Sequence, residues 1–169
     1  MTDSHGNTAF GEAANYCLDY YLKPTNASRL CALVAYYPSN IPDTRSRFPL
    51  SLPVLVHLAG TSVDVTTVPT ALGLQGKKRR RTRPINPGIG TGERLEMAYP
   101  AFTYEYAQPG FAEHDLDEYD CLASDLAWTR TVRALRKGFS RDPDLEQRWE
   151  EHQEGLHSFS IIFQDLVSC

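Results

Sequence analysis

Three short apolar runs predict the strands of a parallel sheet. They are Leu30–Tyr37, Leu52–Gly60 and Ala101–Ala107, and Pro or Gly residues lie close to the ends of each run. Continuous apolar runs of this length are typical of strands that are buried on both faces. We therefore expect an α/β domain in which about three parallel strands are flanked by helices.

Apolar residues at helical spacing predict the flanking helices. One pattern runs from Ala9 to Leu22 and ends before Pro24. A stronger one runs from Tyr119 to Phe139, with Asp117 or Asp120 as its cap. In this second helix we expect Gly138 to fray the end. Its predicted inward stripe is Leu122, Leu126, Thr129, Val132 or Arg133, and Leu135 or Arg136.

The remaining segments divide the chain into two parts. Residues 1–140 would form the α/β domain, with residues 1–8 polar and frayed. Residues 65–100 are rich in Gly and Pro and predict a long basic loop, with helical turns only at Thr66–Leu74 and Glu93–Met97. Residues 141–169 predict a C-terminal helix, the possible start of a truncated second domain.

Composition narrows the class of protein. A chain of 169 residues with a formal charge of -4 predicts one main domain without a general attraction to nucleic acid or anionic membrane. No apolar run reaches the roughly 18 residues of a membrane helix, and the N-terminus lacks the pattern of a signal peptide. The four Cys residues lack metal or disulfide spacing, which favours reduced thiols and a cytoplasmic location.

One basic run stands apart from this acidic background. Residues 77–83 read Lys-Lys-Arg-Arg-Arg-Thr-Arg and would suit phosphate or RNA binding, a nuclear import signal, or a solvated loop. No aromatic residue interleaves the run, so base stacking has no platform there. We expect the solvated loop and no nucleic-acid partner.

The turn after the third strand carries a resemblance to a known family. Residues 104–111 read Tyr-Glu-Tyr-Ala-Gln-Pro-Gly-Phe and resemble the catalytic-histidine turn of the dienelactone hydrolase family, roughly Tyr-Pro-Gly-Ala-x-His-Gly-Phe. Ala107, Gly110 and Phe111 match, and Pro109 stands at the histidine position. Further matches lie at residues 32–37, 53–60 and 123–130, so the resemblance covers about residues 9–139. The tail from Leu145 is similar to the opening helix of a SnoaL-like domain.

This resemblance implies part of an α/β-hydrolase fold that attacks an ester or lactone carbonyl. It implies an acyl-enzyme intermediate and neither a metal nor an organic cofactor. A nucleophile, a base and an orienting acid are needed for such chemistry.

The candidate catalytic residues are Cys17, Asp64 and His114. Cys17 lies in Asn-Tyr-Cys-Leu, which resembles the Gly-Tyr-Cys-Leu-Gly-Gly of the family; the alternative is a small buried hydrophobic residue. Looser elbow matches centre on Ser4 and Thr8. Asp64 follows the second strand in an expected loop, as a catalytic acid or an ordinary turn residue. His114 would have to replace the base that Pro109 cannot provide, or else is a solvated loop residue.

Two functions follow from this pattern. The first is an ester or lactone hydrolase by descent, and the alternative is a non-catalytic binding or interaction module on a lapsed hydrolase fold. Three parallel strands leave two exposed edges, so self-association through those edges is a further expectation.

Overall fold

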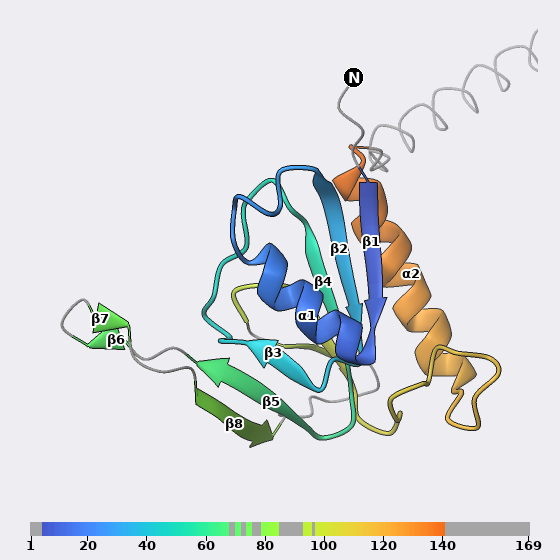
Figure 1. Ribbon diagram of the computed structural model, residues 1–169. Helices are drawn as coiled ribbons and strands as arrows, with labels where there is room; N and C mark the ends of the chain where they lie inside the picture. Colours follow the sequence, from blue (N-terminus) through green and yellow to red (C-terminus); the bar gives the residue numbers. More distant parts are fainter. Residues whose placement is uncertain are drawn as a thin grey trace, which may run out of the picture.

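A five-stranded sheet lies at the centre of the computed structural model (Figure 1). The described residues are 5–67, 70–71, 74–75, 79–84, 93–95 and 97–140. Four strands run parallel, and β9, at one edge, is antiparallel to its neighbour. In spatial order the strands are β1 (His5–Phe10), β2 (Leu30–Tyr36), β4 (Val54–Ala59), β10 (Ala101–Tyr104) and β9 (Glu93–Leu95).

The three predicted strands are confirmed as β2, β4 and β10, with slightly shorter bounds. In β2, Leu33 and Ala35 belong to the core on one face of the sheet, whereas Val34 and Tyr36 belong to the core on the other. Helices cover both faces, so both sets of side chains are buried. This arrangement explains why the runs are continuously apolar.

The polar N-terminal segment differs from the prediction. Residues 5–8 are not frayed but begin strand β1, which pairs in parallel with β2. Only Ala9 of this strand is buried, because β1 is the outermost strand and its sequence is accordingly polar. The helix expected from Ala9 begins at Gly11, because Ala9 and Phe10 belong to β1.

Helix α1 (Gly11–Tyr21) covers one face of the sheet. Its buried residues are Ala14 and Leu18, which pack with strand residues such as Leu33 and Val56. A second, three-stranded sheet shares the core on the α1 side of the main sheet. In this second sheet, β5 lies between β3 and β8. Its strands are β3 (Asn40–Pro42), β5 (Ser62–Thr67) and β8 (Arg79–Pro84).

The prediction of one long loop over residues 65–100 is wrong, because much of the described part of this range forms strands. Strand β5 runs on to Thr67, the short pair β6 (Thr70–Ala71) and β7 (Leu74–Gln75) follows, and the basic residues of β8 pair with β5. The helical turns expected at Thr66–Leu74 and Glu93–Met97 are wrong: the described part of the first is strand, and the second holds strand β9 and a bend at Met97. Val63 and Val65 are buried on one face of β5 while its polar residues lie on the other, an alternation that favours a strand.

Helix α2 (Cys121–Gly138) covers the opposite face (Figure 1). The predicted capping by Asp120 is confirmed, since its carboxylate accepts a hydrogen bond from the Ala123 amide at 2.8 Å. The predicted inward stripe is confirmed in part: Leu126 and Leu135 pack against the core, whereas Leu122 and Thr129 are exposed. The fully buried positions are instead the small residues Ala123, Ala127 and Thr131.

Small residues let α2 approach β2 closely, and Gly138 shows how closely. A Cβ atom added there would lie 2.2 Å from the Cys31 carbonyl oxygen. Gly138 is therefore a contact residue in the last turn of the helix, not the fraying point that its sequence predicts. The helix and SnoaL-like tail predicted within residues 141–169 lie outside the described residues.

A buried hydrogen-bond network ties α2 to the sheet. Arg130 Nη1 donates to Tyr104 Oη at 3.0 Å, which leaves the Tyr104 proton for His57 Nδ1, also at 3.0 Å. His57 Nε2 then donates to Thr131 Oγ1, 3.0 Å away, and Tyr36 Oη lies 2.8 Å from the same hydroxyl. Burial, and secondarily the Arg130 charge, lower the pKa of His57 to about 3, so the imidazole is neutral.

Candidate functional site

The backbone turns sharply at the carboxyl ends of all four parallel strands. The residue with positive φ is Gly11 after β1, Tyr37 after β2, Gly60 after β4 and Gly110 shortly after β10. Tyr37 is the exception among them, since a side chain makes this conformation costly, by about 1 kcal/mol or more. The carboxyl edge of an open parallel sheet is where binding sites are generally built.

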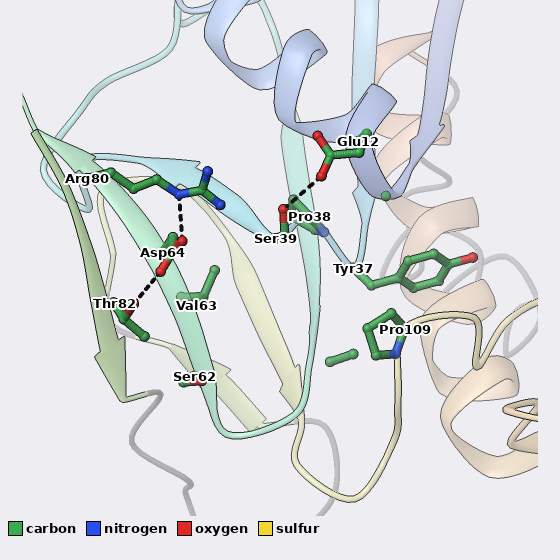
Figure 2. Close-up of a pocket in the computed structure, with 12 residues that line it drawn as sticks. Glu12, Tyr37, Pro38, Ser39, Ser62, Val63, Asp64, Arg80, Thr82 and Pro109 are labelled. Carbon is green, nitrogen blue, oxygen red and sulfur yellow. Dashed lines mark hydrogen bonds and ion pairs between the residues drawn. The ribbon is translucent and has the colours of Figure 1, made fainter. Parts of the chain in front are cut away.

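A cavity of about 440 Å³ opens at this edge, between the main sheet and the second sheet (Figure 2). It is lined by Gly11, Glu12, Tyr37, Pro38, Ser39, Ala59, Ser62, Val63, Asp64, Arg80, Thr82 and Pro109. These residues come from α1, β4, β5 and β8 and from the turns after β2 and β10. The chain therefore brings residues far apart in the sequence to one opening.

The first wall is the turn from β1 into α1. Gly11 sits at that turn with φ +52°, and a Cβ atom built there would have no neighbour within 4 Å. Phe10, at the N-cap position, provides no side-chain cap for α1. The first turn of α1 thus presents backbone N–H groups near the cavity without an N-cap side chain over them.

Polar side chains fix the mouth of the cavity beside α1. Asn15 Nδ2 donates to Ser39 Oγ at 2.9 Å, and Ser39 Oγ donates to Glu12 Oε1 at 3.3 Å. Asn15 Oδ1 also accepts from the Asn40 amide at 3.0 Å. These contacts tie α1 to the segment after β2 and hold the Glu12 carboxylate at the rim.

The second wall carries a charged cluster from β5 and β8. Asp64 and Thr82 are direct cross-strand partners, and Thr82 Oγ1 donates to the Asp64 carboxylate at 2.5 Å. Arg80 Nε donates to the same carboxylate at 2.5 Å (Figure 2). The Thr82 hydrogen bond, and then Arg80, lower the pKa of Asp64, so this carboxyl is ionised at neutral pH.

The third wall is formed by Tyr37 and Pro109 (Figure 2). The Tyr37 hydroxyl donates to the Glu113 carboxylate, which fixes the loop after β10 against the end of β2. Burial, followed by Glu113, raises the pKa of Tyr37, so the phenol stays protonated. Pro109 offers neither a donor nor a base to the cavity.

The three predicted catalytic residues are not brought together at this opening. Asp64 lines the cavity, although it lies in strand β5 and not in the expected loop. Cys17 lies in the middle of α1, faces Asn7 at 3.6 Å and is half-buried, and burial raises the pKa of its thiol. His114 stacks on Tyr119 with a centroid distance of 4.2 Å. Neither Cys17 nor His114 is among the described residues that line the cavity.

Sequence reasoning missed Gly11. Its signal is the hexapeptide Ala-Phe-Gly-Glu-Ala-Ala at residues 9–14, in which small residues surround a strand-to-helix turn. The sequence alone does not indicate this turn, because the polar residues 1–8 predict a frayed end and Ala9 fits the helical spacing. In the structure, Gly11 lies at the turn between β1 and α1, with open space at its Cβ position.

Comparisons with protein-family models, curated proteins and solved structures find no match to this chain. Among the described residues, no group of three His, Cys, Asp or Glu side chains has an arrangement that could hold a metal ion. The helices of the described part are all too short or too polar to cross a lipid bilayer.

Proposed function

We propose that this chain is a non-catalytic binding protein built on a lapsed hydrolase scaffold of the dienelactone hydrolase type. Its cavity holds a small ester or lactone without cleaving it. The support is the succession of strand, sharp turn, helix and three further parallel strands, with the cavity at their carboxyl edge. The resemblance of residues 104–111 to the catalytic-histidine turn points the same way.

The observation that carries the proposal is the identity of two cavity residues. In α/β-hydrolases the nucleophile sits on a strained strand-to-helix turn, flanked by small residues. Here that turn holds Gly11, which has no side chain. The turn that resembles the family's histidine turn holds Pro109. With Gly and Pro at these two places, the site has no nucleophile and no base at the positions where such a hydrolase carries them.

What remains suits binding of a carbonyl group. The backbone N–H after the nucleophile position is an oxyanion-hole donor in such enzymes, and Glu12 supplies that N–H here. The carboxylates of Glu12 and Asp64 at the rim repel an anionic ligand, although Arg80 neutralises the charge of Asp64. These charges favour an uncharged ester or lactone over a free carboxylate.

Ligand titration of matched variants tests this proposal. Ser62 is exposed and lines the cavity, so Ser62→Phe fills space there, whereas Ser51→Phe makes the same change at an exposed loop position outside it. Titrating a small lactone by calorimetry or ligand-observed NMR, we expect Ser62→Phe to weaken binding by about tenfold or more and Ser51→Phe to leave it unchanged. Equal affinities in both variants, or no binding by the unmodified protein, would show that the cavity is not a binding site for the lactone.

A further inference from the structure

The outer edge of β1 is open among the described residues. β1 ends the main sheet, with β2 on its inner side and no described strand on its outer side (Figure 1). The opposite edge is β9, a strand of three residues. Short edge strands protect a sheet from further pairing, whereas a strand of six residues leaves a row of free N–H and C=O groups.

Exposed aromatic side chains flank this edge in the α1 layer. Cys17 faces Asn7 of β1, and Tyr20 follows Cys17 by three residues, so Tyr20 lies on the β1 side of the helix. Tyr16 stacks on Tyr20 with a centroid distance of 5.8 Å. Phe10 ends β1 itself and is also exposed.

The α2 layer continues the same feature. A Cβ atom on Gly6 of β1 would lie within 3.4 Å of both Leu135 and Phe139, so that side of α2 borders the edge. Trp128 precedes Leu135 by two helical turns and lies on the same side. We call the exposed aromatic residues along this edge the edge strip. They are Phe10, Tyr16, Tyr20, Trp128 and Phe139, and between 42% and 69% of each residue is exposed.

Strand β1, His-Gly-Asn-Thr-Ala-Phe, contains no Asp, Glu, Lys or Arg. Natural edge strands are usually protected by charge, Pro or a bulge, and a covering layer makes such protection unnecessary. The only irregularity of β1 lies between His5 and Gly6, at its first residues. Two β1 strands that pair with each other therefore bring no Asp, Glu, Lys or Arg side chains of like charge together.

We propose that two copies of this chain pair through antiparallel β1 strands about a two-fold axis, which joins their two main sheets into one. An antiparallel pair has its two-fold axis perpendicular to the sheet, so each helical layer meets its own copy. Tyr16 and Tyr20 then meet the same residues of the second copy, and Trp128 and Phe139 do likewise. A two-fold interface of this kind closes on itself and stops at the dimer.

Sedimentation equilibrium of the full chain between about 1 and 100 μM, a range that brackets ordinary dimer affinities, tests the pairing. Thr8 is exposed in the middle of β1, so Thr8→Lys places two charges near the axis. Thr129→Lys makes the same change on the outer face of α2, away from the edge strip. We expect dimers for the unmodified protein and for Thr129→Lys, and a dissociation constant about tenfold or more higher for Thr8→Lys.

Tyr16→Lys provides a second probe that leaves β1 unaltered. It should weaken the dimer in the same way while circular dichroism stays unchanged. A monomer at every concentration, open-ended polymers, or dimers that are equally stable in folded Thr8→Lys and Tyr16→Lys would overturn the proposal.

Discussion

At the scale of single residues, the proposed function depends on Gly11 and Pro109. Both sit on turns whose backbone geometry is intact: Gly11 has φ +52°, and Gly110 beside Pro109 has φ +106°. Under the proposed function, these two turns are where an active hydrolase would present its nucleophile and its base, and Gly11 and Pro109 provide neither. This combination predicts that reactivity can be restored by side chains alone.

The double variant Gly11→Cys/Pro109→His tests this statement. The open space around the Gly11 Cβ position leaves room for a thiol, and the positive φ costs about 1 kcal/mol for a residue with a side chain. With p-nitrophenyl acetate we expect a burst of p-nitrophenolate from the double variant. Its rate should exceed that of either single variant by about a hundredfold, as expected when a base activates a nucleophile. Equal rates in all three proteins would show that the two positions do not face each other.

His57 gives the stability of the protein a characteristic pH dependence. Its folded pKa of about 3 lies below the ordinary value of 6.5, so between these values the unfolded chain binds a proton that the folded chain does not. Stability therefore rises with pH through this window and is lost as the pH falls below 6.5. The surrounding groups are Tyr36, Phe102, Tyr104, Thr131 and Arg130, and none of them is a carboxylate that would stabilise a charged imidazolium.

Urea unfolding at several pH values measures this effect in the unmodified protein and in His57→Gln. We expect the unmodified protein to lose up to about 1.4 kcal/mol more per pH unit than the variant between pH 6 and 4, because only it gains the extra proton on unfolding. Parallel pH curves for the two proteins would mean that His57 does not stay neutral in the fold.

Among the elements, α2 depends most on close approach to the sheet. Its buried face consists of Ala123, Ala127 and Thr131, and Gly138 touches the backbone of β2. Small residues at a helix–sheet contact bring the helix near enough for the His57 network to form. Helix propensity alone would favour Ala at Gly138, by about 1 kcal/mol.

The substitution Gly138→Ala separates packing from propensity. A Cβ atom 2.2 Å from the Cys31 oxygen forces α2 away from β2, so we expect the free energy of unfolding to fall by about 1–3 kcal/mol. The exposed neighbour Lys137→Ala should change it by less than about 0.5 kcal/mol. Denaturant unfolding of both variants decides the matter, and a more stable Gly138→Ala protein would show that propensity prevails.

At the scale of the whole molecule, the sequence predicts the buried strands well and the edges poorly. Strands β2, β4 and β10 are apolar throughout because both faces are covered, and the N-cap Asp120 has a local signature. Strand β1 is polar because it is the outermost strand of the main sheet. Strands β5 and β8 are stabilised by pairing with each other, and a local sequence pattern does not reveal that pairing. Gly11 has no recognisable role without β1, because the strand defines the turn in which it lies.

The measurement that tests the central claim most directly is hydrolysis of p-nitrophenyl acetate and a dienelactone. It is made on folded unmodified protein beside Cys17→Ala and Asp64→Asn. The account predicts no turnover above buffer in any of the three, because the cavity holds Gly11 and Pro109 where a nucleophile and a base would be needed. Turnover by the unmodified protein that is lost in both variants would contradict it and would establish Cys17 and Asp64 as parts of an active site.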